Sequence, residues 1–127
     1  MCPLTSYPLQ FKQELQRQRL RPLLMPSEAE LLRALFEFVA STDPDIIVGH
    51  NIVGNDLPIL QSRIIRLKLN WCRLGRLRRS GPLPHLLVND LPSVLMCGRL
   101  VVDTYMSAKE LTKEDDYSLS YLCQKYT

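Results

Sequence analysis

The stretch that decides the fold is DPDIIVGHNIVGNDLP, residues 43–58. Its short, continuous β-branched run at 46–48 predicts a strand that is buried on both faces. Residues 49–51 then leave the strand, and Asn55 or Asp56 can cap a helix whose first turn tolerates the following proline. The stretch therefore predicts an α/β fold, with its loop at the carboxyl end of a strand, where active sites of open α/β sheets collect.

The residues before this stretch predict two helices. Apolar residues mixed with Lys, Gln and Glu indicate a short helix over 8–18. Ser27 and Glu30 have the spacing of a capping box, and apolar residues at helical spacing follow them. We therefore expect a helix over 28–40, ended by the Asp-Pro-Asp turn at 43–45 because proline cannot continue it.

The residues after the stretch predict a second strand beyond a long connection. Residues 71–79 alternate loosely between apolar and basic side chains, which indicates a strand or one arm of a hairpin. Residues 80–92 contain three prolines and are expected to form a long loop. Residues 96–103 have the apolar character of a second buried strand.

The last quarter of the chain predicts two more helices. Ser107 and Glu110 again have capping-box spacing, and residues 114–116 are expected to form a solvated turn. A final helix is expected to begin near Ser118. The sequence ends at Thr127 in the middle of that helical pattern, without a capping glycine or proline, so we expect a truncated part of a larger domain.

Composition excludes several classes of protein. A chain of 127 residues with 46% hydrophobic and 23% charged residues is expected to be globular rather than disordered. No apolar run approaches the roughly 18–20 residues that span a bilayer, and the first residues do not have the pattern of a secretory signal. The sequence has no zinc-ligand spacing, no serine-nucleophile elbow and no Walker-type phosphate loop.

The net charge of +3 is unevenly distributed, because residues 57–89 hold seven basic and no acidic side chains. Arginines near Trp71 are suited to backbone phosphates and base stacking, which predicts a nucleic-acid interface at Arg73, Arg76, Arg78 and Arg79. The alternatives are a solvated basic face and a face that packs against acidic parts of a larger protein.

The loop after the first strand is the best candidate for chemistry. Asp56, close to a helix N-terminus, is suited to a divalent metal ion that faces phosphate oxygens, and Asn51 could position a substrate. The plainer alternative is that Asp56 caps the helix and Asn51 closes a turn. Two-metal chemistry needs several carboxylates, and Asp103 at the end of the second strand is the best-placed partner. Asp43 and Asp45 precede their strand and lie at the wrong end.

Five segments together resemble the exonuclease domain of family B DNA polymerases. Residues 43–58 look like the second exonuclease motif, Asn-x-x-x-Phe-Asp, and four later segments match in order: 74–80, 97–103, 106–111 and 117–122. The resemblance is greater to alpha-type members than to delta or epsilon enzymes. It implies an RNase H-like exonuclease fold, a mixed sheet flanked by helices, of which residues 1–127 would be a part truncated at both ends.

The resemblance also implies a function. It points to a nuclear replication enzyme that extends RNA primers with deoxynucleotides, uses Mg²⁺ and works with a DNA or RNA–DNA primer-template, primase and accessory subunits, without a membrane. By position, Asp56 matches the metal-binding aspartate of the motif and Asn51 matches its asparagine. Asn55 stands where the family usually has Phe, and the first motif, Asp-x-Glu, and the third, Tyr-x-x-x-Asp, do not occur.

These departures predict that this region has neither polymerase nor nuclease activity and binds no metal of its own. Alpha-type members are understood to lack proofreading and to keep the domain as a scaffold that faces DNA. The alternatives are an active 3′–5′ exonuclease domain of a proofreading polymerase and a module for subunit interaction. Open strand edges would favour self-association of the chain.

Overall fold

The computed structural model describes residues 9–18, 23–71, 74–77 and 81–127. The chain divides into two compact units, Met1–Leu35 and Phe36–Thr127. Within the described residues, none of the helices has both the length and the apolar character needed to cross a membrane.

The two helices expected before the deciding stretch are confirmed. Helix α1 spans Leu9–Arg17 and helix α2 spans Glu28–Thr42. The hydroxyl of Ser27 accepts the backbone N–H of Glu30 at 3.2 Å, so the serine caps α2 as its position predicts. The Glu30 carboxylate lies 2.5 Å from the guanidinium of Arg33, one turn along the same helix.

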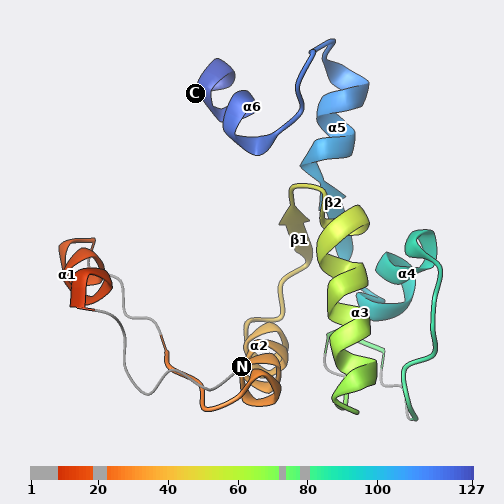
Figure 1. Ribbon diagram of the computed structural model, residues 1–127. Coiled ribbons are helices and arrows are strands. Elements are labelled where there is room, and N and C mark those ends of the chain that lie inside the picture. Colours follow the sequence, from red (N-terminus) through yellow and green to blue (C-terminus); the bar gives the residue numbers. More distant parts are fainter. Residues whose placement is uncertain (1–8, 19–22, 72–73, 78–80) are drawn as a thin grey trace. The chain divides into compact units, whose positions relative to one another are not determined.

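The sheet has two parallel strands, β1 at Ile46–Gly49 and β2 at Leu100–Asp103 (Figure 1). Ile46 pairs with Leu100, and Gly49 pairs with Asp103. Both strands lie where the sequence predicts them, but the expected burial on both faces is wrong. Ile46 is 53% exposed, Val48 60% and Leu100 58%, because within the described residues β1 has one neighbouring strand and these side chains share an uncovered face.

The connection between the strands supplies most of the core. Helix α3 spans Leu57–Arg66, a short 3₁₀ turn (η2) spans Val88–Asp90, and helix α4 spans Leu91–Leu95. Among the described residues, the largest fully buried side chains come from this connection: Leu57, Ile64, Leu74, Leu91 and Leu95. The long loop expected over 80–92 is therefore wrong at its end, because η2 begins at Val88 and α4 at Leu91. Pro92 stands in the first turn of α4, where its missing N–H costs no bond.

The strand expected over 71–79 is wrong for the residues of that range that the structure describes. Trp71 is buried instead, and its indole N–H donates to the carbonyl of Gly81 at 3.3 Å. Arg76 N–H donates to the carbonyl of Cys97 at 2.7 Å. A Cβ on Gly75 would lie 2.9 Å from that carbonyl oxygen. The glycine therefore lets the backbone at 75–76 approach that of Cys97 closely at this one point, without the repeated hydrogen bonds of paired strands.

The two C-terminal helices are present, but one of them begins earlier than expected. Helix α5 spans Thr104–Leu111 and is capped by Asp103, not by Ser107, whose hydroxyl donates to the Asp103 carbonyl from inside the helix at 3.1 Å. Helix α6 spans Leu119–Tyr126 and begins after Ser118, whose hydroxyl accepts the Tyr121 N–H, as the sequence predicts.

The solvated turn expected at 114–116 is wrong for Glu114. Its side chain is only 7% exposed, and its carboxylate accepts bonds from the ammonium of Lys125 at 2.5 Å and from the hydroxyls of Tyr121 and Tyr126 at 3.1 and 2.5 Å. These donors, above all Lys125, lower the pKa of Glu114 from its ordinary value. Glu114 therefore ties α6 to the segment that precedes it.

Candidate functional site

The candidate loop leaves β1 at the carboxyl ends of the two strands, where Gly49 and Asp103 lie opposite each other. Asn51 takes a left-handed conformation, with φ 58° and ψ 31°, which asparagine tolerates better than most residues. A π-helical turn (η1) spans Ile52–Asp56 and continues without interruption into α3. Only His50 and Asn51 therefore lie between the end of β1 and the helical turn that leads into α3.

Asp103 holds this loop in place. Its side chain is buried, and its Oδ1 accepts the backbone N–H groups of Asn51 at 2.8 Å and Tyr105 at 3.0 Å. Its Oδ2 accepts the N–H of Val53 at 3.1 Å. Three donated bonds satisfy a buried carboxylate without a cation, because hydrogen bonds to the charged form stabilise it. Asp103, expected as a partner for a metal ion, thus serves the backbone instead.

Asp56 does not cap α3 as the sequence suggested. Its backbone is helical, with φ −70° and ψ −45°, and its side chain makes no capping bond. The cap is not needed there because the chain is already helical from Ile52 onward. The carboxylate is exposed to solvent, next to the first turn of α3.

The donor set does not fit a metal centre in the described part of the chain. No three His, Cys, Asp or Glu side chains among those residues lie close enough together to hold an ion. Asp103, the carboxylate at the same edge of the sheet as Asp56, already accepts three N–H bonds. Two-metal phosphoryl chemistry needs several converging carboxylates around the two ions, more than the described part of the chain brings together here.

Two glycines shape the loop around Asn51. A Cβ on Gly54 would lie 2.5 Å from the side-chain oxygen of Asn51, so the side chain rests against the π-helical turn. A Cβ on Gly49 would lie 2.7 Å from Cβ of Ile52. The Asn51 side chain therefore packs closely against the turn at Gly54, and Ile52 packs closely against Gly49.

His50 links the loop to the C-terminal segment, a role that the sequence did not reveal. Its Nε2 donates to the carbonyl of Tyr117 at 2.9 Å, and its Nδ1 lies 3.0 Å from the hydroxyl of Thr104. Its ring meets that of Tyr105 edge to face, with centroids 5.6 Å apart. A shallow cavity of about 560 Å³ opens beside it, lined by His50, Asn51, Tyr105, Lys109, Asp115, Asp116, Tyr117 and Ser118. Glycine, histidine and asparagine in sequence indicate only a turn, so no local signal could have located this link.

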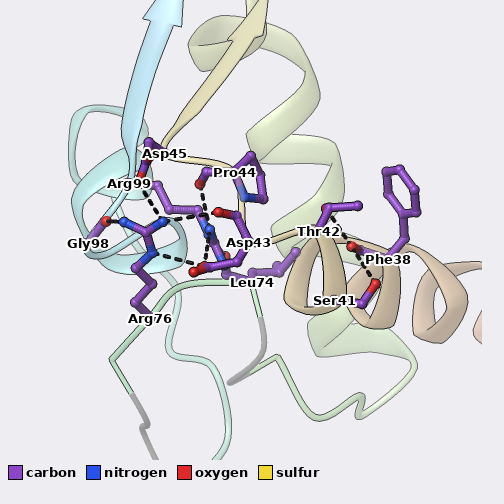
Figure 2. Close-up of polar contacts among 10 residues, drawn as sticks. All are labelled: Phe38, Ser41, Thr42, Asp43, Pro44, Asp45, Leu74, Arg76, Gly98 and Arg99. Atoms are coloured by element: carbon purple, nitrogen blue, oxygen red, sulfur yellow. Dashed lines mark hydrogen bonds and ion pairs between the residues drawn. The ribbon is translucent and has the colours of Figure 1, made fainter.

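Arg76, expected at a nucleic-acid interface, contacts the residues at the amino end of β1 (Figure 2). Its guanidinium lies 2.9 Å from the carboxylate of Asp43 and 2.6 Å from that of Asp45. It also donates to the carbonyl of Gly98 at 3.1 Å. The paired Asp43 raises the pKa of Arg76 further above its ordinary value.

Arg99 completes the same cluster from the buried side (Figure 2). Its side chain is 2% exposed and donates to Asp43 at 2.8 Å, to the carbonyl of Pro44 at 2.6 Å and to that of Leu74 at 2.9 Å. Arg76 first, and then Arg99, lowers the pKa of Asp43. A rigid five-donor fork can satisfy several acceptors at once, which explains an arginine at a buried position.

The other residues of the expected nucleic-acid interface, Arg73, Arg78 and Arg79, lie outside the described residues. Arg76 is therefore the one member of the set that can be placed. It lies at the amino end of β1, whereas Asn51 and Asp56 follow the carboxyl end. Arg76 and the loop that holds Asn51 and Asp56 thus lie at opposite ends of β1.

Comparison with known sequences finds one family. A sequence model described as "DNA polymerase family B, exonuclease domain" matches residues 2–122. The DNA polymerase alpha catalytic subunit of Oxytricha trifallax is 37% identical over 109 residues, covering 77% of this chain and 7% of the relative. That of Mus musculus is 35% identical over 122 residues, covering 94% and 8%. That of Arabidopsis thaliana is 36% identical over 134 residues, covering 93% and 9%. The chain thus spans less than a tenth of each relative's length.

Proposed function

This chain belongs to the exonuclease domains of family B DNA polymerases, and we propose that it is part of the catalytic subunit of a nuclear, alpha-type replicative polymerase. The whole enzyme would be a DNA-directed DNA polymerase that extends primers on a DNA or RNA–DNA primer-template, with primase and accessory subunits as partners. Its nucleotidyl transfer would depend on Mg²⁺ held by residues outside this chain. The names of the three relatives support this assignment.

The proposed architecture is a part of an RNase H-like exonuclease domain. The parallel pair β1–β2, joined by a connection that contains α3 and α4, is an α/β arrangement of the expected kind. The match over residues 2–122 supports the same reading.

The proposed role of this region is a scaffold without exonuclease activity. The observation that carries the proposal is the use of Asp103, whose carboxylate accepts three backbone N–H groups instead of facing an open site. Asp56 belongs to no group of three or more His, Cys, Asp or Glu side chains that could hold an ion among the described residues. The sequence adds two facts to this, namely Asn55 in place of the usual Phe and the absence of Asp-x-Glu and Tyr-x-x-x-Asp.

Digestion of a 3′-labelled single-stranded oligonucleotide tests the scaffold role. We expect no shortening with Mg²⁺ or Mn²⁺, because nuclease chemistry on phosphates needs converging carboxylates. The Asp56→Ala variant should behave in the same way as the unchanged chain. Metal-dependent digestion that is lost in Asp56→Ala would instead establish an active 3′–5′ exonuclease and refute the scaffold role.

A surface that faces DNA is the second part of the proposal, and the basic segment 57–89 supports it. Binding to a primer-template duplex should weaken steeply with salt, because each phosphate contact releases counterions. Charge reversal at Arg78 or at Arg79 should reduce the affinity, whereas Lys113→Glu, the same change of charge at an exposed residue outside the segment, should not. Arg76 is unsuited to this test because it holds Asp43 and Asp45. Unchanged affinity after reversal at Arg78 and Arg79 would exclude a DNA surface there.

A further inference from the structure

Residues 82–87, Pro-Leu-Pro-His-Leu-Leu, lead to η2 as an extended segment without a helix, strand, turn or bend (Figure 1). Proline fixes its own φ at about −65°, and Leu83, which precedes a proline, is confined to extended conformations. Leu87 has φ −68° and ψ 152°, which are close to the angles of a polyproline II helix. The two prolines and the conformation of Leu87 therefore both favour polyproline II geometry for this segment.

Exposure along this segment repeats every three residues. Leu83 is buried and Leu86 is half-buried, so these two side chains face the interior of the chain. The other four side chains are exposed, namely Pro82, Pro84, His85 and Leu87. A strand would alternate every two residues, whereas a polyproline II helix has three residues per turn and places residues three apart on one edge. Pro84 and Leu87 therefore share an outer edge, and Leu87 is 77% exposed on it.

Both ends of the segment are anchored. At its start, the indole N–H of the buried Trp71 donates to the carbonyl of Gly81 at 3.3 Å. At its end, the backbone N–H of Asp90 donates to the carbonyl of Leu87 at 3.0 Å as η2 begins. Between these two anchors, the side chain of Leu83 is only 6% exposed. Contacts on either side therefore fix where the segment begins and ends.

A buried amide holds the middle of the segment from the inside. The side-chain nitrogen of Gln61, on α3, donates to the carbonyl of Pro84 at 3.2 Å and to that of Leu86 at 3.5 Å. Gln61 is 8% exposed, so a partner on the outer edge would not touch it. A polyproline II helix has no hydrogen bonds of its own, and a free proline-rich chain must be ordered when it binds. Here the fold provides that order before a partner arrives.

The chemistry of the outer edge selects an aromatic partner surface. Residues 81–89 contain no Lys, Arg, Asp or Glu, so the segment lacks the cations that bind phosphates, although arginines precede it. Proline and aliphatic side chains at three-residue spacing on a polyproline II backbone fit grooves lined by aromatic rings, as in SH3 and WW domains. Neither a phosphate nor a carboxylate of a partner finds a lysine or arginine on this segment.

We propose that residues 82–87 form a ridge that docks into an aromatic-lined groove of a proline-recognition domain in a partner protein. Pro84 and Leu87 insert between the aromatic rings, while Leu83 stays buried in this chain. The ridge is thereby a protein-docking surface, which goes beyond the proposed polymerase assignment because neither DNA nor catalysis takes part in it.

An array of purified SH3 and WW domains, probed with the whole chain carrying a fluorescent label, tests the proposal. We expect at least one domain to bind, and its affinity for the chain is then measured by fluorescence titration. Pro84→Ala and Leu87→Ala should each lower that affinity about tenfold, because each removes apolar surface from the groove.

A synthetic peptide of residues 81–88 separates the ridge from a merely proline-rich sequence. The peptide should bind the same domain about tenfold more weakly than the chain does, because it lacks the order that Trp71 and Gln61 impose. DNA binding provides a second comparison. Leu87→Ala should leave the affinity for a primer-template duplex unchanged, because it alters no phosphate contact.

The control variant is Pro26→Ala, which removes an exposed proline before α2 and should bind the domain as the unchanged chain does. Circular dichroism of each variant verifies the fold. The proposal is overturned if no domain of the array binds, if either Pro84→Ala or Leu87→Ala binds unchanged, or if the peptide binds as tightly as the chain. An equal loss of DNA affinity in Leu87→Ala would also overturn it, because the ridge would then be a nucleic-acid surface.

Discussion

At the scale of single residues, Asp103 shows how one carboxylate can serve two elements. It ends β2, caps α5 through Tyr105 N–H and holds the entry to α3 through the N–H groups of Asn51 and Val53. These bonds stabilise the folded chain because they are buried, and a buried N–H group without an acceptor costs about 1–3 kcal/mol. The same position looked suited to a metal ion because a sequence cannot tell which donors will surround a carboxylate.

Substitution of Asp103 by asparagine measures this role. The amide nitrogen of Asn would replace one acceptor oxygen and meet a backbone N–H, so we expect a loss of about 2–3 kcal/mol in the free energy of unfolding. Urea denaturation of Asp103→Asn and of the unchanged chain would give the difference between their free energies of unfolding.

The control for Asp103→Asn is Asp115→Asn, an exposed carboxylate in the turn before α6. It should leave the free energy of unfolding almost unchanged. Equal stability of Asp103→Asn and the unchanged chain would show that the three N–H groups find other acceptors.

At the scale of elements, α6 depends on a carboxylate from outside the helix. Glu114 accepts bonds from Lys125, Tyr121 and Tyr126, all of them on α6. These donors lower its pKa from the ordinary value of 4.5. A folded pKa below the unfolded pKa means that the contribution is fully present above about pH 4.5 and is lost as the pH falls through the folded value.

Glu114→Gln tests this contribution as a function of pH. We expect the variant to melt at a lower temperature than the unchanged chain at pH 7, because it lacks the charge that pairs with Lys125. The difference should shrink as the pH falls below about 4.5, because the unfolded glutamate then begins to bind a proton and the folded glutamate, whose pKa is lowered, does so at a lower pH. Thermal melting followed by circular dichroism from pH 7 to pH 3 would record it, and a difference that stays constant over that range would contradict the assignment.

Element boundaries were predictable where their signals are local. Ser27 and Ser118 each accept an N–H of the helix that follows, so the starts of α2 and α6 could be read from nearby residues. The start of α5 could not be read in this way. Ser107 and Glu110 have the spacing of a capping box, but the residue that caps the helix is Asp103, at the end of β2. Among the described residues of 71–79 the expected strand is absent, because a buried indole and one close backbone approach, both set by distant residues, determine their structure.

At the scale of the whole chain, the sheet leaves apolar side chains without cover. Val48 and Leu100 are more than half exposed on one face, and β1 and β2 pair only with each other among the described residues. Unpaired strand edges beside an apolar face favour association between chains. The β-branched run predicted these strands well, but burial depends on neighbours that no local pattern specifies.

We therefore expect the chain to self-associate, and Val48→Lys to reduce that association. A lysine on the exposed face of β1 would bring like charges together whenever two strands pair. Sedimentation equilibrium at several concentrations would measure the change in average mass. Leu111→Lys provides the control, since it adds the same charge at an exposed residue at the end of α5. A monomer at every concentration would contradict the expectation.

The carboxylate of Asp103 also sets the timescale on which part of the backbone meets solvent. The amide protons of Asn51 and Val53 lie about fifty positions from it in the chain. They can be replaced by deuterium only when the loop separates from the end of β2, so both should share one opening event with the amide of Tyr105. Their common exchange rate would therefore report how often this edge of the sheet opens, which is a property of the whole pairing and not of any one of the three residues.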